Sequence, residues 1–366
     1  MLTEKNYKEI ERICSFKELY RGARKCKLNV IWKDSVSGYI NNGLVNIHKL
    51  KEALDDGTYT LDKYQCFTIY EPKMREIIST RFKDRVFQRS LCDNYLYNAL
   101  TKSFIHTNCA CQIGKGTEFA RKKLKAYLQK YYRQHNRSNE GYVLKVDLKN
   151  YFGSTPHELA YQAVEKRVDN DWVLFEIKRI IDSYNQCENP NVGMGLGSQT
   201  TQLIQLAILD DLDHIIKERL HIKFYIRYMD DLILIHDNKE HLKYCLSIIE
   251  NWLLERSLNV NKKKTQLFKV RQGIIFLGFK FKLIETGKVV MTLSPAKISH
   301  ERRKLKKLVE LCRQERLTKS EVDNCYTCWR AYINNETKSK RKNAKRDCHN
   351  LILAMDRYYK NLWEVA

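Results

Sequence analysis

The sequence predicts an α+β fold, with a helix-rich body, a short sheet in the middle of the chain and a bundle of helices at its carboxyl end. Apolar residues make up 43% of the 366 residues, which is enough for a packed interior. They alternate in short runs in the middle of the chain, as in half-buried strands, and recur at helical spacing after it. With only 4 prolines and no linker-like tract, the sequence indicates one continuous body.

The chain is strongly basic, with 66 Lys and Arg residues against 43 Asp and Glu and a formal net charge of +23. A surplus of this size predicts a polyanionic partner. The cations gather in two stretches, 115–137 and 297–346, where interleaved aromatic residues are typical of surfaces that follow a nucleic-acid backbone. The alternative for either stretch is a helix face with lysines for solubility.

Membrane and export signals are not evident in the sequence. No run approaches the ~18 consecutive apolar residues of a membrane span, and the polar amino terminus lacks the apolar core of a signal peptide. We therefore expect a cytoplasmic protein with no membrane partner. Its 12 cysteines are then expected to be buried or free thiols.

The first 140 residues are predicted to be mostly helical, and the strand pattern follows them. Residues 142–147 form a predicted strand that ends on an acid. Isoleucines and leucines at helical spacing predict one helix over 200–220. Two alternating runs within 222–235 then predict a hairpin with Asp230 and Asp231 at its tip.

The carboxyl end is predicted to be helical after a strand pair at 274–283 and 289–293. Ser294-Pro295 supplies an N-cap followed by proline at the first helical position. A capping box at 318–321 opens a second helix, and apolar spacing over 351–362 marks a third. Three amphipathic helices of this length bury one another's apolar faces, so we expect a separate bundle domain.

Three acids of this basic chain occupy positions where catalytic metal ligands are expected. Asp147 ends the predicted strand, and Asp230 and Asp231 form the hairpin tip, so they converge if strand and hairpin are neighbours in one sheet. Nucleotidyl transfer with two Mg²⁺ ions requires carboxylates from separate parts of the chain. The alternative is structural: a polar hairpin turn and an aspartate that caps a helix.

The surrounding sequence resembles that of reverse transcriptases. Tyr228-Met229-Asp230-Asp231 is the hallmark of that family, and the other motif-like segments follow in the family's order. They are 73–77, 84–85, 113–117, 143–152, 193–202, 258–265 and 276–279. The resemblance is closest to bacterial retroelement enzymes of the defence-associated (abortive-infection-like) and diversity-generating branches. It favours them because the glycine-rich motif lacks the glutamine found in many relatives.

The resemblance implies a right-hand polymerase with helical fingers at 1–140, a palm with a small antiparallel sheet at 141–293, which includes part of the fingers, and a three-helix thumb at 294–366. Such an enzyme is an RNA-directed DNA polymerase that joins deoxynucleoside triphosphates into a DNA product with two Mg²⁺ ions, or Mn²⁺ as a substitute. No ribonuclease H, integrase or endonuclease domain is expected after the palm, because the thumb uses nearly all of the remaining residues.

We expect the template to be a structured, dedicated non-coding RNA and the role to be antiphage defence. Two alternatives stay open: the reverse transcriptase of a diversity-generating retroelement, and a catalytically retired RNA-binding scaffold. The three acids argue against a scaffold, because an idle site has no need of convergent carboxylates. The oligomeric state is also open, and the chain could form a homo-oligomer or a hetero-oligomer.

The resemblance also assigns catalytic roles to individual residues. Asp147, Asp230 and Asp231 are the implied metal ligands, assisted by the backbone carbonyl of Leu148. Lys264 is implied to protonate the leaving pyrophosphate, with a solvated or backbone-contacting lysine as the alternative.

Nucleotide and nucleic-acid contacts complete the assignment. Phe152 falls at the family's steric gate, where a ring crowds a ribose 2′-hydroxyl and so favours deoxynucleotides; the alternative is a plain core aromatic. Lys73 and Arg75 are expected to hold the triphosphate. The other expected nucleotide-binding residues are Gly195, Leu196, Gly197 and Gln202. From the helix pattern, we also expect exposed cations of the bundle to bind nucleic-acid phosphates, namely Arg302, Arg303, Lys306, Lys307, Lys340, Arg341 and Lys342.

Overall fold

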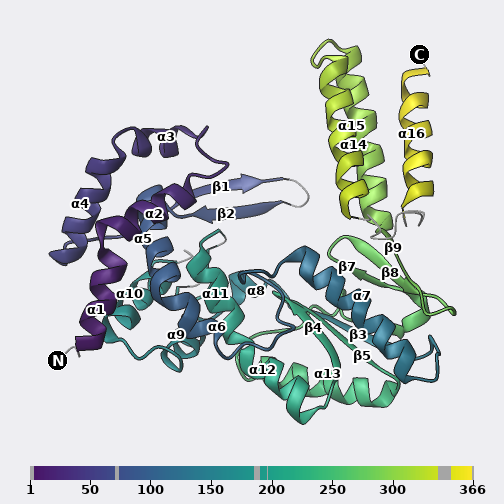
Figure 1. Ribbon diagram of the computed structural model, residues 1–366, viewed down its shortest axis with the longest axis horizontal. Helices are drawn as coiled ribbons and strands as arrows, with labels where there is room; N and C mark the ends of the chain where they lie inside the picture. The colour runs from purple at the N-terminus through teal and green to yellow at the C-terminus, as the bar shows by residue number, and fades with distance from the viewer. Residues whose placement is uncertain (1–3, 71–73, 185–189, 196, 337–347, 365–366) are drawn as a thin grey trace. The chain divides into compact units, whose positions relative to one another are not determined.

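The computed structural model describes residues 4–70, 74–184, 190–195, 197–336 and 348–364 (Figure 1). Its helices and short sheets confirm the predicted α+β fold class. The chain forms two compact units, each built from three segments. The first comprises Met1–Lys115, Lys145–Ile233 and Lys243–Thr265, and the second comprises Gly116–Leu144, Leu234–Leu242 and Gln266–Ala366. The fingers, palm and thumb boundaries stay a prediction.

The amino-terminal part of the first unit consists of five packed helices and a hairpin. The helices are α1 (Glu4–Cys14), α2 (Phe16–Cys26), α3 (Asp34–Asn41), α4 (Gly43–Asp55) and α5 (Phe82–Leu91). Helix α2 lies directly on α5, because a Cβ atom at Gly22 would lie only 2.9 Å from the Val86 backbone oxygen. The hairpin of β1 (Gln65–Ile69) and β2 (Arg75–Ser79) was not predicted, since most β1 side chains are exposed and show no alternation of burial.

The predicted single helix over 200–220 is wrong. The structure divides it at Leu209 into two α-helices and ends it in a π-helical segment. Asp210 and Asp213 in this region are turned inward, where Arg167 and Arg227 pair with them. The remaining helical segments of the first unit are η1 (Cys92–Leu96), α6 (Tyr97–Thr101), α8 (Tyr151–Ser154), α9 (His157–Glu165), α10 (Asp171–Asp182), α11 (Gln199–Ile208), α12 (Asp210–His214), η2 (Ile215–Arg219) and most of α13 (Lys239–Leu254).

A four-stranded sheet carries the three predicted acids. Its strands are β3 (Tyr142–Asp147), β4 (Phe224–Tyr228), β5 (Asp231–His236) and β6 (Gln266–Lys269), in the order β4-β5-β3-β6. Strand β3 has the predicted bounds, and β4 and β5 form the predicted hairpin. Because β5 lies between β4 and β3, the hairpin and the strand that ends on Asp147 are neighbours, as the convergence of the acids requires.

The second unit holds helix α7 (Thr117–Gln134), a 3₁₀ turn η3 (Val270–Gln272) and an antiparallel sheet of β7 (Ile274–Phe276), β8 (Phe279–Leu283) and β9 (Val289–Leu293). The sequence predicted a strand pair here. The first of its strands is instead divided into β7 and β8 by a tight turn, in which Leu277 and Gly278 both have positive φ angles of 47° and 83°.

The predicted carboxyl-terminal helices are confirmed as α14 (Pro295–Arg313), α15 (Lys319–Glu336) and α16 (His349–Glu364), which run side by side (Figure 1). Leu305, Tyr326 and Met355 form their shared interior. The capping box is present: the Thr318 backbone N–H donates to Glu321 Oε2 at 2.8 Å, and the Glu321 N–H donates to Thr318 Oγ1 at 3.3 Å.

Two further findings bear on the sequence predictions. The cysteines within the described ranges are all unbridged. Among the helices that the structure describes, none is both long and apolar enough to cross a membrane.

Candidate functional site

The tip of the β4–β5 hairpin has an unfavourable backbone conformation. Met229 follows β4 with φ = 54°, in the left-handed region that a two-residue hairpin turn usually fills with glycine. The Arg227 guanidinium holds the tip in place, because its Nη1 donates to the Met229 carbonyl at 3.2 Å. Asp230, the other turn residue, and Asp231, the first residue of β5, are thereby presented at the sheet edge.

Arg227 is itself anchored by a fully buried ion pair. Its Nε lies 2.8 and 2.9 Å from the two carboxylate oxygens of Asp213, and its Nη2 lies 2.7 Å from Oδ2. Tyr225 donates to the same carboxylate at 2.5 Å. Burial lowers the pKa of Arg227, but the adjacent carboxylate outweighs this and keeps that pKa above its ordinary value. Neither partner is exposed, so this pair fixes β4 to α12 rather than contacting a ligand.

Asp147 is paired with a lysine that comes from a distant part of the chain. The Asn261 N–H donates to the Asp147 carbonyl at 2.6 Å, and the Lys149 N–H donates to the Asn259 carbonyl at 2.8 Å. These bonds hold the turn after α13 against the end of β3. Lys264 Nζ consequently lies 2.7 Å from Oδ1 and 2.9 Å from Oδ2 of Asp147. The sequence assigned Lys264 a catalytic role but did not predict this contact.

Asp230 and Asp231 lie close enough to Asp147 for its charge to affect their pKa values. Burial, and then the charges of Asp231 and Asp147, raise the pKa of Asp230 to about 6. Burial is also the first cause that raises the pKa of Asp231, opposed by Lys145, whose Nζ lies 3.5 Å from Asp231 Oδ1. Burial and neighbouring carboxylates disfavour the ionised forms of Asp230 and Asp231, and such an environment is suited to an added cation.

The donor set fits a hard divalent cation, although its side chains are not yet gathered around one. Within the described ranges, no three His, Cys, Asp or Glu side chains are grouped so that they could hold a metal ion. Lysine ammonium groups instead contact Asp147 and Asp231. Asp231 Oδ1 is buried, lies 3.5 Å from Lys145 Nζ and accepts no hydrogen bond from the residues that the structure describes. Carboxylate oxygens are the ligands that Mg²⁺ prefers. Leu148 is buried beside Asp147. It forms an isolated antiparallel β-bridge with Val260, made by the backbone hydrogen bonds of Asp147 and Lys149 described above.

Phe152 is linked to the glycine-rich loop through the backbone. The Met194 N–H donates to the Phe152 carbonyl at 2.8 Å. The half-buried Phe152 ring stands edge-to-face on Tyr151 with centroids 6.0 Å apart. Tyr151 is buried and donates to the Gln205 carbonyl at 2.6 Å. The sequence did not point to Tyr151 as a support, although it adjoins Phe152.

The loop itself requires glycine at position 195. A Cβ atom there would lie 2.1 Å from the ring of Tyr184, and the carbonyl of Gly195 accepts a hydrogen bond from Thr201 at 2.9 Å. Gly197 has φ = 108°. Gln202 Oε1 accepts from the Cys111 thiol at 3.4 Å. No sequence signal marked Tyr184, because only tertiary packing brings it beneath Gly195.

Of the remaining predicted residues, four lie on α14 and the others are not described or have no described side chain. On α14, Arg302, Arg303, Lys306 and Lys307 are all exposed, as predicted. They belong to the second unit, whereas the acids belong to the first. Lys73, Leu196, Lys340, Arg341 and Lys342 lie outside the described residues, and Arg75 lies in β2 with its side chain not described.

Comparison with known proteins gives a family match. The family model described as reverse transcriptase (RNA-dependent DNA polymerase) matches residues 71–281, more than half of the chain. That range includes Asp147, Asp230, Asp231 and Lys264. No protein of curated function matches the sequence.

Telomerase structures are similar over much of the chain at low identity. Telomerase from Candida albicans, solved in complex with a TWJ fragment of telomeric RNA, is 10% identical with a TM-score of 0.48, covering 87% of this chain and 64% of that one. Apo telomerase from Candida tropicalis truncated from its C-terminal domain is 13% identical (TM-score 0.46, 69% and 60% covered). Apo telomerase from Candida tropicalis is 14% identical (TM-score 0.46, 63% and 48% covered). The chain thus spans about half to two thirds of the length of these proteins.

Proposed function

Because this chain belongs to the reverse transcriptase family, the RNA-dependent DNA polymerases, we propose that it is a nucleotidyltransferase that copies an RNA template into DNA. The observation that carries the proposal is the arrangement of Asp147, Asp230 and Asp231. These acids end a central strand and form the tip of the neighbouring hairpin, and the charge of Asp147 helps to raise the pKa of both Asp230 and Asp231. A plain polar turn does not account for an acid buried beside two others.

Asp147, Asp230 and Asp231, with the carbonyl of Leu148, would hold two Mg²⁺ ions or Mn²⁺. When bound, such ions activate the primer hydroxyl and stabilise charge on the leaving pyrophosphate. Lys264 contributes a proton donor: its Nζ contacts Asp147, yet 51% of its side chain is exposed. An ammonium group at that place is suited to protonate a departing phosphate.

Phe152 and the glycine-rich loop are proposed to select the sugar. The Phe152 ring is partly exposed and packed on the rigidly held Tyr151, so it offers an apolar wall that a 2′-hydroxyl would crowd. Gly195, Leu196, Gly197 and Gln202 are proposed to contact the nucleotide, with Lys73 and Arg75 on the triphosphate. The cations of α14, with Lys340, Arg341 and Lys342, would bind phosphates of the template–primer duplex.

For the biological role, we propose a bacterial retroelement enzyme of the defence-associated branch, with a dedicated structured RNA as template. The support is the motif resemblance described above. A diversity-generating retroelement is the alternative, because its enzymes resemble the same motifs. A retired scaffold is disfavoured, since burial and the charges of Asp231 and Asp147 raise the pKa of Asp230, and a site without a reaction gains nothing from that cost.

The test is primer extension on an RNA template with purified protein. We expect Mg²⁺-dependent DNA synthesis that falls about 10³-fold or more in Asp147→Ala and Asp230→Ala, because both acids stabilise charge on the reacting oxygens. Asp237→Ala is the matched control, since this exposed acid directly follows β5 on the side away from the tip. Near-normal synthesis by folded Asp230→Ala protein would contradict the proposal. RNA binding without synthesis by the wild type would indicate the scaffold.

A further inference from the structure

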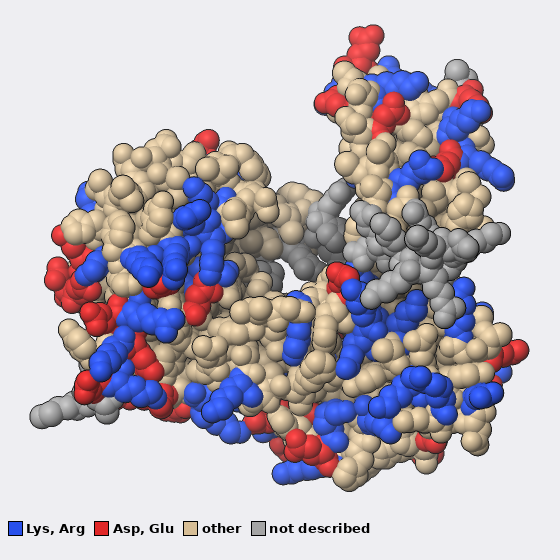
Figure 2. Space-filling view, in the orientation of Figure 1, with Lys and Arg blue, Asp and Glu red and all other residues tan. Residues whose placement is uncertain are grey.

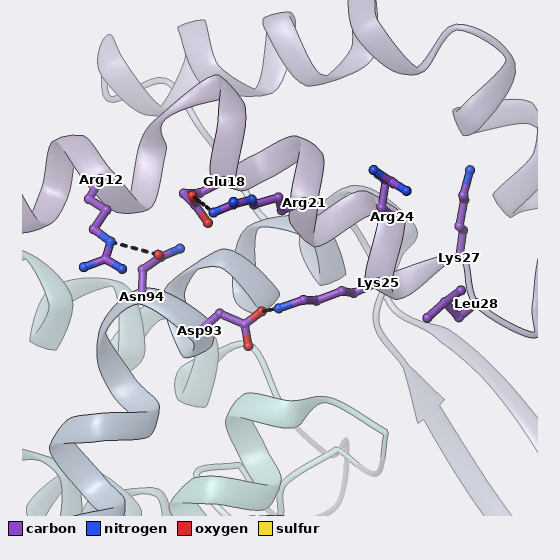
Figure 3. A pocket seen from close by; sticks show the side chains of 9 residues that line it. All are labelled: Arg12, Glu18, Arg21, Arg24, Lys25, Lys27, Leu28, Asp93 and Asn94. Atoms are coloured by element: carbon purple, nitrogen blue, oxygen red, sulfur yellow. Dashed lines mark hydrogen bonds and ion pairs between the residues drawn. The ribbon is translucent and has the colours of Figure 1, made fainter. Parts of the chain in front are cut away.

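A basic pocket lies among the amino-terminal helices. It is a cavity of about 670 Å³ lined by residues of α1, α2, the turn after α2, and η1 (Figure 3). All of these residues belong to the first unit. The part contributed by α1 and α2 precedes the range 71–281 that matches the reverse transcriptase family. The pocket therefore needs an explanation of its own.

Cations outnumber acids in the lining by five to two. Arg21, Arg24 and Lys25 share one face of α2, because residues three and four apart on a helix lie together. Glu18 accepts from Arg21 Nη1 at 2.7 Å, and Asp93 accepts from Lys25 Nζ at 2.7 Å. The two acids of the pocket are thus already neutralised.

Among the residues that the structure describes, three cations of the lining form no ion pair with a carboxylate. Arg12 Nε donates at 3.1 Å to the neutral amide oxygen of Asn94. Arg24 and Lys27 form no ion pair within the described residues, and they stand apart from the dashed contacts in Figure 3. In Figure 2, which has the orientation of Figure 1, Lys and Arg side chains gather over the place of α2. Guanidinium and ammonium donors without a carboxylate partner are suited to phosphate oxygens.

The turn after α2 also carries exposed apolar side chains. Leu28, which lines the pocket, is 66% exposed, and Trp32 is 75% exposed. The indole is held in position, since its Nε1 donates to the Asn29 carbonyl at 3.1 Å and Lys33 Nζ lies 5.4 Å from the ring centroid. Aromatic rings beside cations are how proteins bind unpaired bases and their backbone together.

We propose that this pocket and Trp32 form a binding site for single-stranded nucleic acid, separate from the acidic site. Arg24 and Lys27 contact backbone phosphates, and Trp32 stacks on a base. The proposal rests on the proposed function only in naming where the bound single strand comes from: the RNA template or the DNA product. A protein partner is disfavoured, because a pocket with surplus positive charge does not match an apolar docking surface.

The experiment measures fluorescence anisotropy of short fluorescein-labelled oligouridylate and oligothymidylate, without nucleoside triphosphates. In Arg24→Glu/Lys27→Glu we expect affinity to fall about tenfold or more and the log–log salt slope to flatten by about 1.4, or ~0.7 for each lost phosphate contact. Lys102→Glu/Arg219→Glu is the matched control, since it makes the same charge change at exposed residues of the first unit. Trp32→Ala should weaken binding about fivefold or more, and Trp32→Phe should retain most of it.

The two probes identify the source, because the tighter strand marks either template or product as the occupant. Equal losses in the pocket and control variants would overturn the proposal in favour of overall charge. Full competition by inorganic tripolyphosphate, with no effect of Trp32→Ala, would overturn it in favour of a simple phosphate pocket. Unchanged oligonucleotide binding, with altered sedimentation of Trp32→Ala, would indicate a protein interface instead.

Primer extension by the wild type is measured separately. If the wild type extends no primer but the pocket variants still lose oligonucleotide affinity, the pocket stands and the polymerase assignment fails. If extension is normal and the pocket variants bind as the wild type does, the pocket proposal fails alone. Thermal unfolding of each variant checks that the fold is retained, as expected for these surface side chains.

Discussion

Two ion pairs of the first unit lie close to the same hairpin and differ in almost every physical respect. The Arg227–Asp213 pair has no exposed surface and is surrounded by further hydrogen bonds. The Lys264–Asp147 pair joins a lysine with a 51% exposed side chain to an acid with a 10% exposed one. The first pair has no path to a ligand, whereas the second can exchange its lysine for another cation.

The difference shows that one ion pair near the hairpin stabilises its backbone, whereas the other belongs to the proposed reaction site. A sealed pair cannot release either charge, because an unpaired charge in the interior is strongly disfavoured. It therefore fixes the backbone of the tip. A pair with one solvated partner loses little when it opens, since water accepts the lysine. Variants of the sealed pair should change stability, and variants of the open pair should change activity.

The largest expected effect comes from Asp213→Asn, which leaves Arg227 buried without a counter-charge. We expect the free energy of unfolding, measured by urea denaturation, to fall by about 3–5 kcal/mol. Asp211→Asn is the control on the same helix, with an expected loss below about 1 kcal/mol. Its pair with Lys166 is exposed, and its second partner, Arg167 at 3.3 Å, keeps Asp210 at 2.9 Å. Similar losses in the two variants would remove the distinction drawn here.

Lys264→Met tests the open pair. Removal of the proposed proton donor should reduce the rate of primer extension about 100-fold. The free energy of unfolding should fall by about 1 kcal/mol, less than in Asp213→Asn, because the remaining Asp147 side chain keeps 10% exposure and can be hydrated. Lys263→Met, an exposed neighbour in the same turn, should leave both quantities unchanged. A large loss of stability with normal activity would make Lys264 a structural residue.

Asp84 is an intermediate case, a buried acid held by neutral donors. Tyr59 donates to it at 2.8 Å and the Asp62 N–H at 3.0 Å, while burial raises its pKa to about 6. The folded state therefore binds the proton more tightly than the unfolded chain, so the wild type loses stability as pH rises from 4 through 6.

In Asp84→Asn this titration is absent. The difference in unfolding free energy, variant minus wild type, should rise by about 2–3 kcal/mol between pH 4 and pH 7. Urea denaturation at several pH values measures it. A difference that does not depend on pH would show that Asp84 keeps an ordinary pKa in the folded protein.

The smallest expected effect concerns selectivity at the exposed side of the site. Phe152→Ala removes the ring proposed to crowd a 2′-hydroxyl, so the ratio of deoxynucleotide to ribonucleotide incorporation should fall about tenfold. Competition between the two substrates on one template measures it. An unchanged ratio would make Phe152 a packing residue of the Tyr151 contact.

Much of the acidic site could be predicted because its elements have local signals. The bounds of β3 follow from a short, mostly apolar segment that ends on an acid, and the hairpin follows from two apolar runs around a polar turn. The Arg227–Asp213 pair could not be predicted, because Asp213 faces inward only in a helix divided at Leu209. The apolar spacing over 200–220 did not indicate that division. The contact between Tyr184 and Gly195 depends on tertiary packing alone, as does the place of Lys264 beside an acid 117 positions earlier.

The first unit is discontinuous in sequence, and this affects how the chain can be synthesised and fragmented. Its third segment ends at Thr265, directly after Lys264, and the two intervening segments belong to the other unit. During translation Asp147 emerges 117 residues before Lys264, so the nascent site stays incomplete until the turn that carries Lys264 has left the ribosome. Nonsense or proteolytic truncation before residue 259 removes the segment that pairs with the end of β3. A fragment of that kind exposes the sheet edge and is a natural substrate for chaperones and proteases.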